Sequence, residues 1–138
     1  MIKTKFIPPY TGAKCNLLFA KGKSGVYIIK KGSKIAYVGY SETDIYKTCT
    51  RHFQSWNDKT QTRVTYRDKT AYTVRIILTT PARAAKLEKG LIIAYEPTDN
   101  PDKLKSYTIT TQAAKIMDEY EHAPQVGNEH WDGVNLPF

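Results

Sequence analysis

The chain has 138 residues, of which 41% are hydrophobic and 25% are charged, and its formal net charge is +8. This length and composition are typical of one folded domain with an ordinary hydrophobic core. The sequence has no apolar stretch of about 20 residues and no apolar run typical of a secretory signal, so we expect neither a membrane span nor export.

The N-terminal part contains Pro8-Pro9 and predicts a loop-rich extension over residues 1–22, with a short strand near 15–19. A hairpin is expected next, with strands near 25–30 and 35–39. The following helix is expected from about 44 to 57, and its N-cap candidates are Ser41, Thr43 and Asp44.

The segment after this helix is polar and basic and predicts a loop, in which Val64 is the candidate for a short strand. Residues 71–78 are rich in β-branched side chains and predict a third strand. Thr80 as N-cap and Pro81 at the first helical position predict a second helix, which reaches about Tyr95 before Pro97 stops it.

A last helix is expected near 110–121, followed by an irregular end. The order of elements predicts a mixed α/β (α+β) fold, with its helices packed against a small sheet. We expect a central domain over residues 23–105, with an acidic helix and tail over 106–138 that pack on it.

The charge distribution favours a polyanionic partner. Residues 1–89 carry 18 Lys and Arg against 5 Asp and Glu, a net of +13, whereas residues 90–138 carry 3 against 8, a net of −5. Nucleic acid is the expected partner of the basic part, and a solvated basic surface without a partner is the alternative. The two cysteines, Cys15 and Cys49, lack metal-ligand spacing and fit a reducing cytoplasm.

One carboxylate interrupts the apolar face of the second helix. Glu88 lies four residues after Ala84, three before Leu91 and four before Ile92, so it falls inside the apolar stripe. Burying a carboxylate without a partner is costly, so Glu88 must reach a partner or a cation. An ion pair with Arg75 on the neighbouring strand is the structural alternative to a metal ion.

The first helix carries a milder irregularity. His52 runs along the margin of its apolar face and Arg51 lies just beyond that margin. A histidine at such a margin is usually structural, but a histidine and an arginine together in a basic chain indicate an edge that contacts phosphate.

The hairpin places two tyrosines next to glycines. The first strand begins Gly25-Val26-Tyr27, and the second contains Tyr37-Val38-Gly39. A helix with basic residues follows, then the helix with Glu88, and then Asn100. In this order and spacing, across residues 23–105, the chain resembles the GIY-YIG endonuclease family.

The resemblance implies a small antiparallel three-stranded sheet flanked by helices. It also implies hydrolysis of a DNA phosphodiester with one Mg²⁺ or Mn²⁺ ion, giving a 5′-phosphate and a 3′-hydroxyl. It implies Glu88 as the metal ligand, Tyr27 as the general base or water-positioning group, and Tyr37 as the group that orients water or phosphate. Tyrosine has a reference pKa of about 10 and needs nearby positive charge, or a relay through His52 or metal-bound water, to act at neutral pH. Asn100 is expected to tether the site or the substrate.

The hairpin geometry fits this interpretation. With a turn over residues 31–33, Tyr27 lies directly opposite Tyr37, and both phenols project from one face of the sheet. We expect Gly25 and Gly39 to leave room for a nucleic-acid backbone to approach that face.

The position of the family's helix arginine is ambiguous. An ungapped count from Gly39 reaches Lys47, and an alignment on the helix pattern reaches Thr48. Arg51, one helical turn further on, is the preferred candidate to stabilise transition-state charge, because a guanidinium grips phosphate with two donors. Tyr40 follows the second motif and is either a phosphate contact or a strand-end aromatic. The remaining expected DNA contacts are Lys47, Arg63 and Arg67.

Two other function classes compete with the endonuclease. A nucleic-acid-binding module that has lost catalysis is favoured by Thr48 at one alignment position of the arginine. A basic scaffold that recruits proteins through its acidic tail is the third class. In that tail, His130 lies eight positions after His122, a spacing that does not favour a metal site, and Trp131 is expected to pack on the core.

Overall fold

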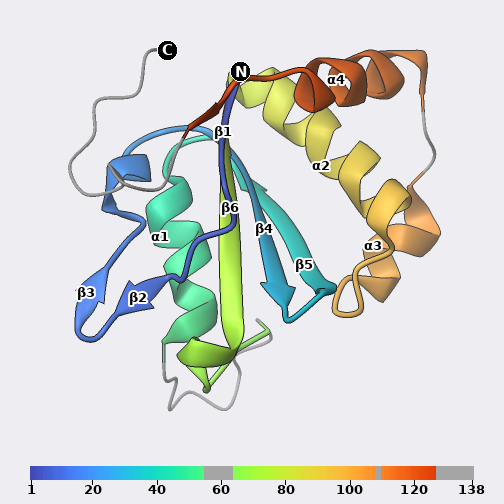
Figure 1. Ribbon diagram of the computed structural model, residues 1–138. Helices are drawn as coiled ribbons and strands as arrows, with labels where there is room; N and C mark the ends of the chain where they lie inside the picture. Colours follow the sequence, from blue (N-terminus) through green and yellow to red (C-terminus); the bar gives the residue numbers. More distant parts are fainter. Residues whose placement is uncertain (55–63, 108–109, 127–138) are drawn as a thin grey trace.

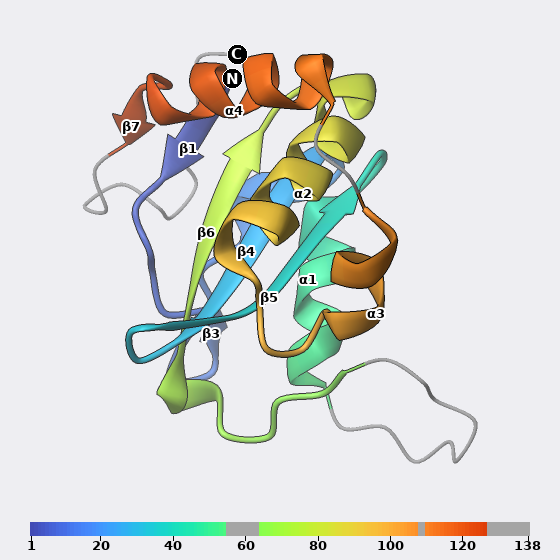
Figure 2. The same cartoon turned by 90° about the vertical axis from the view of Figure 1, so that its right-hand side faces the viewer.

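The structure is a computed structural model that describes residues 1–54, 64–107 and 110–126. It has a mixed α+β fold, as the order of elements predicted. Figure 1 shows a central sheet with α1 (Ile45–Thr50) on one side and α2 (Pro81–Tyr95) and α4 (Thr111–Glu121) on the other. In Figure 2, α2 lies across the front of the sheet and α1 lies behind it.

Within the described residues, the sheet has five strands in the order β5-β4-β6-β1-β7. Neighbouring strands are antiparallel, except that β7 runs parallel to β1. The bounds of the strands are β1 Ile2–Thr4, β4 Gly25–Lys31, β5 Lys34–Ser41, β6 Tyr72–Leu78 and β7 Gln125–Val126. The sheet is therefore larger than the three strands expected, because β1 and β7 extend it beyond β6.

The N-terminal segment, residues 1–22, is built into the fold. It supplies β1 to the sheet, and Ile7 and Leu17 are buried in the core. A short strand near 15–19 was expected. The structure instead has β3 (Lys14–Cys15), paired with β2 (Tyr10–Thr11) in a small hairpin, and then a 3₁₀ turn (Leu18–Ala20), so the expectation was wrong beyond Cys15.

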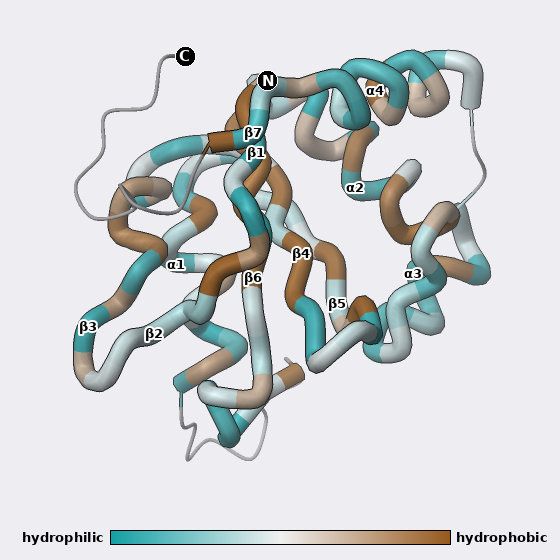
Figure 3. Tube along the Cα trace, in the orientation of Figure 1, coloured by the Kyte–Doolittle hydropathy of each residue, from teal (hydrophilic) through white to brown (hydrophobic). Residues whose placement is uncertain are grey.

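Hydrophobic side chains fill both faces of the sheet. On the face that α1 covers, here called the α1 face, Tyr27, Ile29 and Ile76 pack with Ile45 and Cys49. On the opposite α2 face, the cluster contains Val26, Ile28, Val38, Leu87, Leu91, Ile116 and Tyr120. The two clusters are called the α1 core and the α2 core below. Figure 3 shows hydrophobic segments along β4 and α2. The run along β4 is continuous because helices cover both faces of the sheet, so side chains that point to either face are buried.

The second helix has the bounds and cap that the sequence predicted. Thr80 accepts a hydrogen bond from Arg83 N, and Pro81 occupies the first turn. The first helix begins at its expected cap, because Asp44 accepts from Lys47 N, but it ends early. After Thr50 the chain forms one 3₁₀ turn, Arg51–Phe53, and the residues beyond 54 that were expected to continue the helix lie outside the described ranges.

The last helix, α4, was expected near its observed position and packs on α2 through Ala113, Ile116 and Tyr120. A short helix before it, α3 (Pro101–Ser106), was not predicted. Val64 lies in an irregular segment rather than in a strand, and a 3₁₀ turn (Lys69–Ala71) precedes β6. Trp131 and His130 lie outside the described residues. None of the described helices is long and apolar enough to cross a membrane.

The hairpin register differs from the expectation. Tyr27 pairs with Gly39, and Tyr37 pairs with Ile29. A two-residue turn at Gly32-Ser33, with Gly32 at a φ of 59°, moves the register by one residue, and a bulge between Ile29 and Lys30 moves it by another. A shift of two residues preserves the side-chain alternation, so Tyr37 remains on the same face as Tyr27 but not opposite it.

Candidate active site

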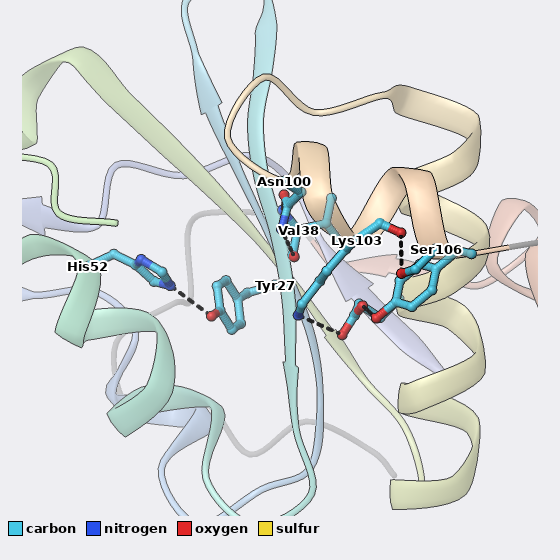
Figure 4. A network of polar contacts seen from close by, with 8 residues as sticks. Tyr27, Val38, His52, Asn100, Lys103 and Ser106 are labelled. Atoms are coloured by element: carbon cyan, nitrogen blue, oxygen red, sulfur yellow. Dashed lines mark hydrogen bonds and ion pairs between the residues drawn. The ribbon is translucent and has the colours of Figure 1, made fainter. Parts of the chain in front are cut away.

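The buried phenol of Tyr27 is hydrogen-bonded to a buried histidine. Tyr27 Oη lies 2.9 Å from His52 Nε2, and His52 Nδ1 lies 2.7 Å from the carbonyl oxygen of Val64. Because a carbonyl only accepts, Nδ1 carries a proton, so in the neutral form of the imidazole Nε2 is the acceptor for the Tyr27 hydroxyl. Figure 4 shows the two side chains pointing toward one another. The arrangement can take a proton from the phenol.

Tyr37 covers this pair. Its ring stacks on Tyr27 with 6.1 Å between centroids, and its centroid lies 4.5 Å from that of His52. Tyr27 and His52 are both 2% exposed, whereas Tyr37 is partly exposed. The outer side of Tyr37 lines an open cleft of ≈350 Å³, whose other lining residues are Val64 and the segment Asp99–Lys103.

The two glycines of the hairpin make room inside the protein. A Cβ atom on Gly39 would overlap the Tyr27 phenol, and one on Gly25 would overlap the backbone oxygen of Ile77 and the side chain of Ile45. The glycines therefore allow the Tyr27 ring to cross β5 and allow β4 to pack closely on β6 and α1. This corrects the expectation that they leave room for a nucleic-acid backbone.

Glu88 lies inside the α2 core, as its place in the apolar stripe predicted. Its side chain is 0% exposed, and Oε1 accepts a hydrogen bond of 2.9 Å from the Tyr107 hydroxyl. Its cation is Lys103, whose Nζ lies 3.6 Å from Oε2. Burial raises the pKa of Glu88, while Lys103 and Tyr107 act in the opposite direction. The alternative partner, Arg75, instead donates to Tyr120 and Gln125.

Sequence reasoning missed Lys103 and Tyr107. Lys103 belongs to α3, and Tyr107 is its C-cap. Asn100 followed by Pro101 is a helix-start pattern that could have identified α3. Lys103 also lines the cleft beside Tyr37, so it connects the cleft to the buried Glu88 carboxylate.

Asn100 tethers the cleft to the sheet. Its Oδ1 accepts from Val38 N at 2.8 Å, and its Nδ2 donates to Val38 O at 3.2 Å. Figure 4 shows this amide against the backbone of β5. Asn100 is 4% exposed and its side-chain oxygen and nitrogen bond the protein, so the structure favours tethering of the site over direct contact with a substrate.

Asp99 holds a further aromatic residue of the site. It accepts a 2.6 Å hydrogen bond from the Tyr66 hydroxyl, and burial together with this bond raises the pKa of Tyr66. Tyr66 N in turn donates to the His52 carbonyl at 2.6 Å. Asp99 thus fixes the segment whose Val64 carbonyl orients His52. No sequence signal identified this contact.

The expected convergence of both phenols and Glu88 is not observed for Tyr27. Tyr27 belongs to the α1 core, whereas Glu88 lies on α2 among the residues of the opposite core. The sheet separates them because the Tyr27 side chain points to the face that α1 covers, whereas α2 covers the opposite face. The cleft at the β5 edge is where the two sets meet, with Tyr37 and Lys103 in its lining.

The other expected contacts are spread around this centre. Arg51 is partly exposed and engaged in an interaction, Lys47 on α1 is exposed, and Arg67 is exposed beyond the Val64 segment. Tyr40 packs on the α2 core, which favours the strand-end aromatic alternative. Arg63 lies outside the described residues.

Glu88 offers one carboxylate to a metal ion. Among the described residues, no three His, Cys, Asp or Glu side chains gather into a metal site. Within the same residues, Glu88 Oε2 is buried and has no hydrogen-bond partner. A carboxylate oxygen is the ligand that Mg²⁺ and Mn²⁺ favour, so Glu88 fits the role of one protein ligand with water and phosphate as the others.

Comparisons with models of protein families, with curated proteins and with solved structures found no match for this chain.

Proposed function

We propose that this protein is a metal-dependent DNA endonuclease with a GIY-YIG-like site at the edge of β5. The observation that carries the proposal is the chain of hydrogen bonds from Tyr27 through His52 to the Val64 carbonyl. A tyrosine with a purely structural role can donate its hydrogen bond to any acceptor. A tyrosine that acts as a general base must pass its own proton to a partner that can hold it. Imidazole is such a partner near neutral pH.

In this proposal a phosphate of the substrate binds in the cleft between Tyr37 and Lys103. Because Tyr27 is buried beneath Tyr37, the Tyr37 ring turns aside before Tyr27 contacts the attacking water. Tyr27 then takes a proton from the water and passes its own to His52 Nε2. Arg51 or Lys47 supplies positive charge for the transition state.

Glu88 is the residue that would hold the divalent ion, through Oε2. Because the sheet lies between Glu88 and Tyr27, the scissile phosphate would have to lie at the edge of β5, in the cleft that Tyr37 and Lys103 line. When bound, Mg²⁺ or Mn²⁺ supplies Lewis-acid stabilisation of the charge that develops on the leaving 3′ oxygen. Tyr107 keeps the other oxygen of Glu88 in place and so fixes the direction of the carboxylate.

A second candidate is a nucleic-acid-binding module without catalysis. It is favoured by the burial of Glu88 and by its contacts to Tyr107 and Lys103, which already account for the carboxylate as a structural group. The net positive charge of residues 1–89 is consistent with both candidate functions, because both require binding to nucleic acid.

A plasmid-nicking assay with Mg²⁺ separates the candidates. The endonuclease predicts that the wild type converts supercoiled DNA into nicked DNA, and that Tyr27→Phe and Glu88→Ala do not. The binding module predicts that all three proteins shift DNA equally in a gel and that none cuts. Arg51→Ala and Lys47→Ala in the same assay decide which residue stabilises the transition state, since only the loss of that residue reduces cutting strongly.

A further inference from the structure

The two oxygens of the Glu88 carboxylate are held unequally. Oε1 accepts a 2.9 Å hydrogen bond from Tyr107, whereas Oε2 lies 3.6 Å from Lys103 Nζ, which is too long for a hydrogen bond. Within the described residues, Oε2 is a buried oxygen without a hydrogen-bond partner. Glu88 therefore depends on Lys103 for charge compensation but is not fixed to it.

Lys103 is able to leave Glu88. Its side chain is 42% exposed, while that of Glu88 is 0% exposed. It stands on α3, a six-residue helix without a fully buried residue, and its four-carbon stem is flexible. The ammonium can therefore turn into solvent or into the cleft while Glu88 remains where it is.

A phosphate in the cleft would compete for the Lys103 ammonium. Lys103 is the one cation in the described lining of the cleft, where Asp99 and Asp102 supply carboxylates. These carboxylates disfavour an anion, so a phosphate depends on contact with Lys103. Once Lys103 turns toward it, Glu88 is a buried charge without compensation, which is costly.

We propose that Lys103 is an exchangeable counter-ion that couples substrate binding to cation binding. A DNA phosphate draws Lys103 into the cleft, and the released Oε2 of Glu88 accepts the divalent cation. This inference rests on the proposed function and adds regulation of the same site: the cation is held tightly only when DNA is present. By linkage, the cation must strengthen DNA binding by the same factor.

The first test measures Mn²⁺ binding without DNA, from the EPR signal of free Mn²⁺. Lys103→Met is expected to bind Mn²⁺ about 5- to 150-fold more tightly than the wild type, the usual range of such couplings. Lys105→Met is the matched control, because it removes the same charge from an exposed position of α3. It is expected to bind Mn²⁺ within about twofold of the wild type. Lys103→Gln keeps a polar side chain and serves as the second variant if Lys103→Met folds poorly.

Adding Glu88→Gln to Lys103→Met locates the ion, since the gain must then disappear. The proposal is overturned if Lys103→Met and Lys103→Gln bind Mn²⁺ no better than Lys105→Met. It is also overturned if the gain survives Glu88→Gln, because the ion would then lie elsewhere.

The second test measures the coupling itself in a Tyr27→Phe background, which prevents cutting during the measurement. A short duplex is expected to tighten Mn²⁺ binding by about 5- to 150-fold, and Lys103→Met is expected to bring this factor close to one. An unchanged factor in Lys103→Met contradicts the proposal. This result can be told apart from failure of the proposed function. If the wild type does not nick DNA but the coupling persists, the proposed function is wrong. If the wild type nicks DNA but shows no coupling, only this inference is wrong.

Discussion

Val64 decides how the imidazole of His52 can be used. Its carbonyl accepts the proton on Nδ1, so Nε2 is the nitrogen that faces the Tyr27 hydroxyl. This places a proton acceptor 2.9 Å from a phenol that would otherwise hold its proton at neutral pH. Gly39 is part of the same device, because the Tyr27 ring crosses β5 at this residue.

Gly39→Ala is expected to reduce the nicking rate by about 100-fold, because the added methyl group would overlap the phenol and move it away from His52. The same change is expected to lower the free energy of unfolding by about 1–3 kcal/mol through overpacking. Single-turnover nicking and urea unfolding check both effects. A wild-type rate in this variant would show that the position of the phenol does not matter.

Single residues of the site differ in how far the sequence could predict them. The burial of Glu88 follows from the helical period, since it lies between Ala84 and Leu91 on one face. Its partners were harder to predict: the Asn100-Pro101 pattern could have located α3, but α3 has no apolar repeat to show that Lys103 and its C-cap Tyr107 face Glu88. The sequence predicted a proton relay from Tyr27 through either His52 or metal-bound water. It gave no indication of the Val64 contact, because the group that orients His52 is a backbone carbonyl, which every residue has.

The free edge of β5 is covered by the loop between α2 and α3. Thr98 N donates to Ile35 O and Asp99 N donates to Ala36 O, and the side chain of Asn100 then takes the place of a backbone peptide opposite Val38. The loop therefore hydrogen-bonds along the edge of β5 much as a further strand would. It also places α3, with Lys103, beside the cleft.

Asn100→Ala is expected to lower the free energy of unfolding by about 1–3 kcal/mol, because Val38 loses two buried hydrogen bonds. Asn100→Asp is expected to destabilise as well, since a carboxylate cannot donate to the Val38 carbonyl. Ser106→Ala removes an exposed hydrogen bond on α3 and is expected to stay within about 0.5 kcal/mol of the wild type. Denaturant unfolding measures all three. Equal stability of Asn100→Ala and Ser106→Ala would contradict the tether.

Elements with strong local signals were predicted and short ones were not. Helix α2 has an N-cap, a proline in its first turn and a full apolar stripe, and its bounds match the prediction. The strands β1 and β7 have three and two residues, too few for an alternating pattern. They form because β6 and α4 bring distant segments together, which is a tertiary effect.

The basic and acidic parts of the chain are interwoven in the folded molecule. The acidic helix α4 packs on α2 through Ile116 and Tyr120, and Lys3 of β1 donates to the carbonyls of Tyr120 and Glu121 at its end. Truncation after residue 105 would expose this core, so the acidic tail cannot be tested by removal. The effect of the acidic residues can instead be tested by replacing them one at a time with neutral residues.

DNA affinity is expected to fall linearly with the logarithm of salt concentration, because bound Lys and Arg release counter-ions. Lys47→Ala and Arg67→Ala, on exposed positions of α1 and the Val64 segment, are each expected to reduce the slope by about 0.9. Lys86→Ala is the control, because Lys86 is exposed on α2, across the sheet. Fluorescence anisotropy at several salt concentrations measures the slopes. A larger change for Lys86→Ala would place the DNA on the opposite face.

Alkaline pH is expected to destabilise the protein through a buried thiol. Burial raises the pKa of Cys49 well above its usual 9.0, so the folded state keeps a proton that the unfolded state loses. The thiol's contribution to stability is complete below about pH 9 and is lost as the pH rises through the folded pKa. Urea unfolding between pH 7.5 and 10 should show a smaller decline for Cys49→Ala than for the wild type. Parallel declines would contradict this expectation.

The most direct test of the account is the single-turnover rate of DNA cutting in Tyr27→Phe with Mg²⁺ at neutral pH. Loss of the hydroxyl that faces His52 is expected to reduce the rate by about 10²- to 10⁴-fold, the usual contribution of a general base. Tyr120→Phe, which removes another buried and hydrogen-bonded hydroxyl on α4, is expected to cut within about twofold of the wild type. If Tyr27→Phe cuts as fast as Tyr120→Phe, or if the wild type does not cut at all, the account is wrong.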